Sequence, residues 1–267
     1  MALERCEGIV LRTYALGDTS RIVVAYTRER GLLRMVAKGA RKTPSRFGFS
    51  LEPLSRSRFL VYLKAGRELQ LLSQAEPLGV LGSELRELER LAHAEAALEL
   101  VDRLVWGEEP QPELYDLLAE TLEAVRRAAP ASLTAVTLAF QLQTASLLGY
   151  RPRLDACAHC GAPLSPRLLF SPARGGMLCD RCGASEAGTV TLSADALAGL
   201  SLLLSRPIAD AGDYLELRRA GEILRVVELF LRHHFQRFQG LNALAMLRGA
   251  DADADADTPE ARVAWPS

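Results

Sequence analysis

Residues 8–37 read GIVLRTYALGDTSRIVVAYTRERGLLRMVA, and this stretch decides the fold of the first part of the chain. Short runs rich in β-branched and aromatic residues are separated there by turns at Gly17 and Gly31. Such runs predict β-strands joined by tight turns. Two further runs of this kind follow, at residues 58–63 and 69–72. Five short strands in about 75 residues predict a small closed barrel of the OB-fold type, and an SH3-like barrel fits the strand count nearly as well.

A helical period replaces the strand pattern after the barrel, beginning with Ser83 as a candidate N-cap. Apolar residues recur there at spacings of three, four or seven, which is typical of amphipathic helices. The expected helices cover residues 83–107, 112–130, 132–148, 193–205 and 213–239. The chain is therefore expected to be an α+β multi-domain protein. Its expected parts are an OB-fold barrel in residues 1–80, a helical domain in residues 81–248 with a zinc-ribbon-like insertion at about 154–186, and a disordered acidic tail in residues 249–267.

Four of the five cysteines form two C-x-x-C pairs, Cys157 with Cys160 and Cys179 with Cys182, and 18 residues separate the pairs. This spacing is that of a zinc ribbon, in which each turn directs two thiolates at one point and two turns complete a tetrahedral sulfur shell. A glycine follows each pair and is expected to take a positive φ. We therefore predict one structural Zn²⁺ ion held by Cys157, Cys160, Cys179 and Cys182.

Other interpretations of the cysteines are weaker. The N-terminus does not resemble a signal peptide and no apolar run is long enough for a membrane helix, so a reducing cytoplasm is expected, where two disulfides are unusual. His93-Ala94-Glu95 followed by C-x-x-C resembles the zinc deaminase signature, but Ala156 stands where that signature has proline. Cys6 is expected to be a packing residue.

The net charge of −1 conceals a strong asymmetry. Residues 1–64 hold 13 Lys and Arg against 5 Asp and Glu, a net of +8, so the other residues hold 19 basic and 28 acidic side chains, a net of −9. A basic first quarter on an otherwise acidic protein indicates a local polyanion-binding surface, with a merely solvated charged face as the alternative.

The basic residues of this first quarter gather after the third expected strand. The candidates for DNA contacts are Arg34, Lys38, Arg41, Lys42, Arg46, Arg56 and Arg58. Cationic surfaces with aromatic platforms bind single-stranded nucleic acid with little sequence preference. Several aromatic residues of this region should fill the barrel, so one or two at most are expected to be exposed. Phe47 and Phe49 are flanked by loop residues and are the better candidates for exposed stacking side chains.

Three stretches of the chain resemble the RecO family of bacterial DNA repair proteins. The first is the basic loop, KGARK at residues 38–42 with SRF at 45–47. The second, GYRPRLDAC at 149–157, resembles that family's G-Y-x-P-x-L-x-x-C. The third, residues 170–179, resembles its F-S-x-x-x-G-G-x-x-C. The likeness extends from residue 5 to residue 248.

The resemblance implies a mediator of DNA repair and homologous recombination. Such a protein binds single- and double-stranded DNA, anneals complementary strands and, with RecR, helps to load RecA onto DNA coated by single-stranded DNA-binding protein. Lys38, Arg41, Lys42 and Arg46 carry over as DNA contacts, with Arg34, Arg56 and Arg58 as secondary ones. The resemblance also implies that the helical part captures the acidic C-terminal tail of single-stranded DNA-binding protein. The candidate residues for that capture, which could equally form a solvated face, are Arg218, Arg219, Arg225, Arg232 and Arg237.

On this interpretation the protein is a cytoplasmic, nucleoid-associated binding protein and not an enzyme. The sequence contains no nucleotide-binding P-loop, zinc-protease or hydrolase-elbow motif. One alternative is a zinc-dependent enzyme that modifies nucleic acid, which requires an open metal position. Another is a zinc-ribbon protein-interaction module of transcription or translation that does not bind DNA directly.

Overall fold

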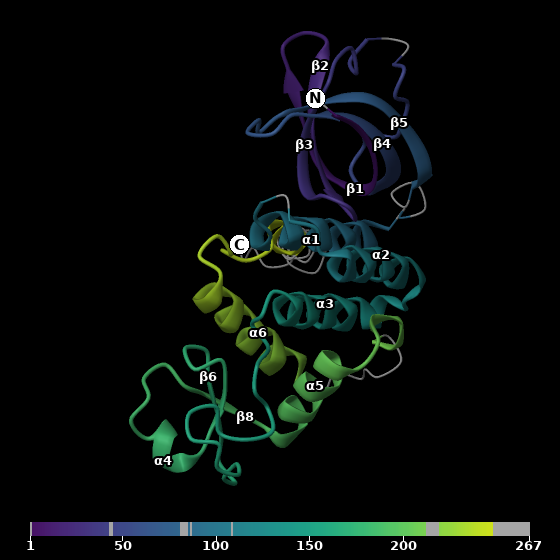
Figure 1. The fold of residues 1–267 in the computed structure, drawn as a ribbon. Coiled ribbons are helices and arrows are strands. Elements are labelled where there is room, and N and C mark those ends of the chain that lie inside the picture. The colour runs from purple at the N-terminus through teal and green to yellow at the C-terminus, as the bar shows by residue number, and fades with distance from the viewer. Residues whose placement is uncertain are drawn as a thin grey trace, which may run out of the picture.

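The computed structural model describes residues 2–42, 45–80, 85, 87–107, 109–211 and 219–247. A β-barrel, a helical body and a small three-stranded sheet follow one another along the molecule (Figure 1). This arrangement confirms the predicted α+β class. The division into domains at residues 80 and 248 stays a prediction, and residues 249–267, where a disordered tail is expected, lie outside the described part of the chain.

The barrel consists of β1 (Ala2–Leu16), β2 (Ser20–Thr27), β3 (Gly31–Ala37), β4 (Ser55–Leu63) and β5 (Gln70–Val80). Its strand order is β1-β2-β3-β5-β4, and β1 closes the barrel by pairing with both β2 and β4. The β3–β5 pair is parallel, and the other pairs are antiparallel. This closed five-stranded barrel confirms the OB-fold prediction.

Two local features let β1 serve two neighbours. A bulge between Val10 and Arg12 bends the strand, as bulges do. Gly8 lies where neighbouring strands approach closely, because a Cβ there would come within 2.8 Å of Thr27 Cγ2 and 2.9 Å of the Phe59 ring. A side chain at position 8 would therefore push the strands of the barrel apart.

The helical body contains α1 (Leu88–Leu104), α2 (Pro112–Arg127), η1 (Pro130–Ser132), α3 (Leu133–Leu147), α5 (Ala194–Ser205), η2 (Ile208–Asp210) and α6 (Ala220–His234). The expected helices over 112–130, 132–148 and 193–205 are confirmed, with Ser193 accepting a capping hydrogen bond from the Ala196 amide. Position 83, the expected first N-cap, lies outside the described residues, and α1 begins after Glu87.

The last expected helix is wrong at its C-terminal end, because α6 stops at His234 rather than at residue 239. Phe235 leaves the helix with an extended backbone and packs edge-on against Tyr150, with ring centroids 4.8 Å apart. Phe238 is then buried at 2% exposure. The packing of these two rings against the body therefore decides where the helix ends. The helical period of the sequence does not indicate this packing.

The barrel packs on the helical body through both apolar and polar contacts. Ile9, Leu11, Val24 and Tyr26 on the outside of the barrel belong to the same apolar cluster as the buried faces of the helices. A second cluster fills the inside of the barrel. Three cross-links join the two parts: Arg12 to Asp102 at 2.8 Å, Arg28 to Asp116 at 2.6 Å, and the Tyr115 hydroxyl, which donates to Glu7 at 2.8 Å.

The small sheet has the order β7-β6-β8 and contains β6 (Leu168–Ser171), β7 (Gly176–Leu178) and β8 (Val190–Leu192), with the short helix α4 (Asp180–Gly183) beside it. Phe170 of β6 meets Phe230 of α6 edge-on, with centroids 6.3 Å apart. This contact docks the sheet on the side of the body away from the barrel (Figure 1). No described helix of the protein has both the length and the apolar character needed to cross a membrane.

Candidate metal centre and nucleic-acid interface

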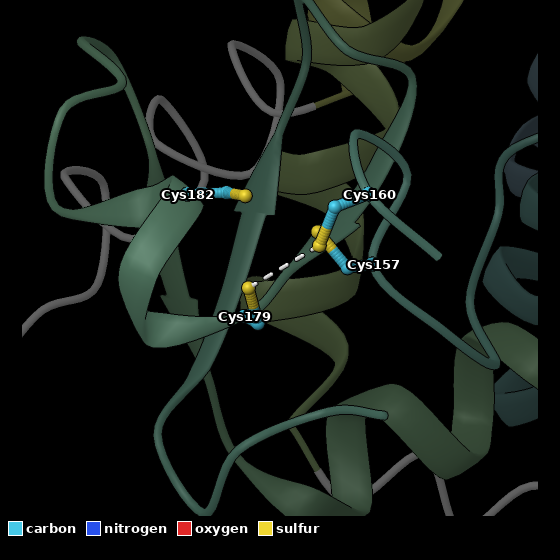
Figure 2. Close-up of side chains that lie close together, drawn as sticks. All are labelled: Cys157, Cys160, Cys179 and Cys182. Carbon is cyan, nitrogen blue, oxygen red and sulfur yellow. Dashed lines mark hydrogen bonds between the residues drawn. The ribbon is translucent and has the colours of Figure 1, made fainter. Parts of the chain in front are cut away.

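The four cysteines of the two C-x-x-C pairs converge in the small sheet module. Their Sγ atoms all lie within 4.8 Å of one another, and Figure 2 shows the side chains pointing toward a common centre. Cys160 Sγ and Cys179 Sγ are 3.8 Å apart. In a tetrahedral shell with metal–sulfur bonds of about 2.3 Å, neighbouring sulfurs are about 3.8 Å apart. The donor set therefore fits one metal ion held by four thiolates.

The backbone around the sulfurs builds this arrangement locally. The Gly161 amide donates to the Cys157 carbonyl at 2.9 Å, and the Gly183 amide donates to the Cys179 carbonyl at 2.8 Å. Gly161 has the expected positive φ of 74°. Gly183 instead lies in α4, and it is small for another reason, because a Cβ there would come within 2.5 Å of Leu169 Cδ1.

The electrostatics of the cluster differ between its cysteines: the pKa values of Cys157 and Cys160 are lowered, whereas burial and the neighbouring cysteines raise the pKa of Cys182 to about 12. Burial disfavours the thiolate of Cys157, but hydrogen bonds from the backbone at Cys160, Cys179 and His159 outweigh it and lower the pKa of Cys157 to about 6. Arg181 lies beside Cys160 and Cys182, which raise the pKa of its guanidinium. Arg181 was not predicted from the sequence to lie beside the sulfurs. Its position between Cys179 and Cys182, inside the second C-x-x-C turn, could have indicated this.

Residues outside the cluster behave as packing groups. Cys6 is buried in the barrel interior, where burial raises its pKa to about 12. His93 is buried in α1, with its Nδ1 2.7 Å from Thr137 Oγ1, and burial lowers its pKa to about 4. Neither side chain belongs to the group of metal-type donors found among the described residues.

The basic loop after β3 is exposed and well anchored. The Arg41 amide donates to the Thr19 carbonyl at 3.0 Å, and the Arg41 guanidinium donates to the Gly17 carbonyl at 2.7 Å. These bonds tie the loop to the β1–β2 turn and leave Lys38 and Lys42 in solvent. Among the residues that the structure describes, no carboxylate forms an ion pair with Lys38, Arg41 or Lys42. The loop is therefore an uncompensated positive patch.

Other predicted cations lie elsewhere on the barrel. Arg46 and Arg58 line a groove of about 580 Å³ between the loop, β1, β4 and β5, together with Arg5. Arg58 also reaches Glu76 at 3.3 Å. Sequence reasoning missed Arg5, which enters this groove because β1 pairs with β4 and sets it opposite Leu60.

Arg34 and Arg56 differ from the loop cations. Arg34 is half-buried on β3 and is paired across the strands with Val24 of β2. Arg56 forms an ion pair with Glu7, whose other hydrogen bond comes from Tyr115 of α2. Burial raises the pKa of Glu7, but Tyr115 and Arg56 together outweigh it and keep this pKa below its usual value. Arg56 is thus already engaged at the junction between barrel and body.

The expectation that Phe47 is exposed is wrong, and the expectation for Phe49 is confirmed. Phe47 is only 3% exposed and joins the apolar cluster inside the barrel, whereas Phe49 is 76% exposed. The loop folds back over the barrel, so Phe47 and Leu51 close its interior. The residues that flank Phe47 in the sequence do not indicate that the loop folds back over the barrel.

The arginines proposed for capture of an acidic tail are mostly engaged. Arg219 lies 3.8 Å from Glu222, and Arg232 bonds Glu228 at 2.8 Å. The Arg237 guanidinium stacks on the exposed Trp106 ring, 4.5 Å from its centroid. Arg225 is exposed, and position 218 lies outside the described residues.

Comparison with known proteins places the chain in one family. Two family models match it in sequence: "Recombination protein O N terminal" over residues 1–81 and "Recombination protein O C terminal" over residues 85–242. A DNA repair protein RecO from Pelotomaculum thermopropionicum is 35% identical over 89% of this chain and 91% of its own length. RecO proteins of Streptomyces griseus and Thermobifida fusca are 37% and 36% identical, over 91% and 94% of this chain and 98% and 100% of their own lengths. The chain therefore belongs to the RecO family.

Proposed function

We propose that this protein is a mediator of DNA repair and homologous recombination that binds single- and double-stranded DNA on its barrel. In this proposal it anneals complementary strands and, with RecR, helps to load RecA onto DNA coated by single-stranded DNA-binding protein. Membership of the RecO family, whose relatives are named DNA repair proteins, supports the repair role. The observation that carries DNA binding is the anchored and uncompensated loop that holds Lys38, Arg41 and Lys42.

The physical basis is the release of counterions from the phosphates. Each cation that meets a phosphate frees a condensed counterion, so affinity falls with salt concentration. Four contacts, from the loop and Arg46, give a log–log slope of about −3 on single strands. Arg34 and Arg58 are secondary contacts, and Arg56 contributes least because Glu7 already neutralises it.

Annealing follows from two cationic surfaces on one barrel. The loop after β3 and the groove lined by Arg5, Arg46 and Arg58 can each hold a phosphate backbone. A positive surface between two strands reduces their repulsion, and base pairing then drives the reaction. This function requires no bond-making group, so we propose a non-enzymatic role.

We propose that the four-sulfur centre holds one structural Zn²⁺ ion. Four protein thiolates complete a tetrahedral shell, so no position remains open for a substrate or an activated water. An ion bound there would hold the β6–β8 sheet and α4 together.

Two protein partners belong to the same proposal. RecR would share the DNA-bound state, and the acidic C-terminal tail of single-stranded DNA-binding protein would bind the helical body. Arg225, exposed on α6, and Arg237, stacked on Trp106, are exposed arginines that could contact such a tail. These activities would place the protein in the cytoplasm, in contact with the nucleoid.

The test compares DNA binding by the wild type and a Lys38→Ala/Arg41→Ala/Lys42→Ala triple variant. Fluorescence anisotropy with a labelled oligonucleotide over a range of salt concentrations gives the affinity and the slope. We expect the variant to bind more weakly and its slope to become less negative by about 2, because three contacts are lost. A triple variant of Arg127, Arg151 and Arg167, which are exposed on the helical body and the insertion, removes the same charge elsewhere and should bind as the wild type does.

Equal binding by the wild type and the loop variant would contradict the assignment of the loop. A wild type that binds no oligonucleotide would favour the alternative of a protein-interaction module. Strand annealing, followed without nucleotide by fluorescence quenching of two complementary labelled oligonucleotides, tests the annealing step separately.

A further inference from the structure

The outer face of β1, β2 and β3 carries an exposed aromatic ring among cations. The strand register sets two rows across this face, namely Tyr14, Ile22 and Val36 in one and Arg12, Val24 and Arg34 in the next. Val23 and Met35, the neighbours of these residues along the strands, fill the barrel interior. Because side chains alternate along a strand, the two rows point away from the barrel interior. Val24 in the second row is buried against the helical body, whereas Tyr14 in the first row is exposed.

Tyr14 is held in place but not covered. Its residue exposure is 45%, and it lies two residues before the end of β1, close to the β1–β2 turn. The Arg12 guanidinium lies over the ring, with its Cζ 5.1 Å from the centroid. Arg12 is itself fixed by Asp102 of α1, at 2.8 Å, and the Asp102 side chain is only 10% exposed. The helical body therefore orients the ring through Arg12.

The surroundings of the ring suit a nucleotide. Ile22 and Val36 beside it are half-buried and form an apolar floor. Arg34 on β3 and Lys38 just after it supply positive charge on the same side of the barrel. Glu52, an acidic residue of the loop before β4, is already paired with Arg21 at 2.7 Å.

We propose that Tyr14 is a base-stacking residue, and that a single strand crosses the outer face of β1–β3 with a base on this ring and phosphates near Arg34 and Lys38. The inference rests on the proposed DNA binding and adds a contact that charge alone does not supply. A flat ring pinned by a guanidinium loses little freedom when a base stacks on it, and stacking does not depend on the identity of the base.

The test separates stacking from charge with two probes of equal length, a labelled oligo-dT and a labelled oligonucleotide of abasic sites. Tyr14→Ala should weaken binding to oligo-dT by about 5- to 150-fold and leave binding to the abasic probe unchanged. Its salt slope should match that of the wild type, because no phosphate contact is lost. Tyr14→Phe keeps the ring and should bind oligo-dT within about twofold of the wild type. Tyr62→Ala, on β4 away from this face, is the matched control.

Three outcomes would overturn the inference. In the first, Tyr14→Ala binds oligo-dT as tightly as Tyr62→Ala and the wild type do. The outer face of β1–β3 would then be a candidate for contact with a protein partner and not with DNA. The second is an equal loss on both probes, which would make the ring structural, and the melting temperature of each variant identifies a folding defect. The third is a reduced salt slope. Failure of DNA binding as a whole is recognised separately, because the wild type would then bind neither probe.

Discussion

The surroundings of His93 predict that the stability of the folded protein depends on pH. Its side chain is buried between α1 and α3, and burial lowers its pKa to about 4. The unfolded chain, with a histidine pKa near 6.5, therefore takes up a proton before the folded protein does. The contribution of His93 to stability is fully present above about pH 6.5 and is lost as the pH falls toward 4.

We expect this loss to reach about 2 kcal/mol at pH 5 and about 3 kcal/mol at pH 4. The measurement is the free energy of unfolding in urea at pH 7 and pH 5 for the wild type and for His93→Gln, which cannot titrate. The variant should show the smaller pH dependence. Equal pH dependence in the two proteins would mean that His93 is protonated in the folded state.

The cysteine cluster predicts a second outcome at single residues. Cys157→Ser removes one of the four clustered sulfurs, so we expect the purified variant to lack the one equivalent of metal proposed for the wild type and to melt at a lower temperature. Cys6→Ser changes the fifth cysteine, which is buried in the barrel, and should keep one equivalent. The measurement is the metal content of Cys157→Ser and Cys6→Ser, determined by elemental analysis after acid releases the metal. A full equivalent in Cys157→Ser would remove that residue from the ligand set.

At the scale of the elements, the contacts between barrel and body should differ in strength. The Arg28–Asp116 pair is bidentate, but both side chains are more than two-fifths exposed, so solvent screens it. The Arg12–Asp102 pair sets a carboxylate that is 10% exposed against a guanidinium. We expect Asp116→Asn to cost less than about 1 kcal/mol of stability and Asp102→Asn about 1–3 kcal/mol.

Urea unfolding midpoints of the two variants, measured side by side, check this order. Both substitutions keep the shape of the side chain, so cavity formation does not enter the comparison. A larger loss in Asp116→Asn than in Asp102→Asn would contradict the argument from burial.

The elements were predictable from sequence where a local pattern decides them. Alternation located the strands of the barrel, and the cysteine spacing located the cluster of four cysteines that could hold a metal ion. The predictions were wrong where contacts between residues far apart in the sequence determine the structure. Phe47 is inside the barrel because a loop folds back over it, and α6 ends at His234 because Phe235 meets Tyr150. Arg5 and Tyr14 were not predicted as DNA contacts from the sequence. Strand pairing places each of them beside residues that are distant in the sequence.

On the scale of the whole molecule, the small sheet module with the four cysteines and the barrel with the basic loop lie at opposite ends, with the helical body between them (Figure 1). We therefore expect Cys157→Ser, if it stays folded, to bind a labelled oligonucleotide within about twofold of the wild type, because it changes no charge on the barrel. Anisotropy titration of the metal-free variant is the measurement. A tenfold loss of affinity with an intact barrel would show that the two ends are coupled.

The closed barrel has a further consequence for contacts between copies of this protein. Each of its five strands pairs with two neighbours, and the β3–β5 contact spans two residue pairs, so the described part of the barrel offers an adjacent copy little free strand edge. Open strand edges would otherwise favour strand addition between neighbouring copies and fibrous aggregates. The pairing of the first strand with the fourth thus removes an edge on which two barrels could join.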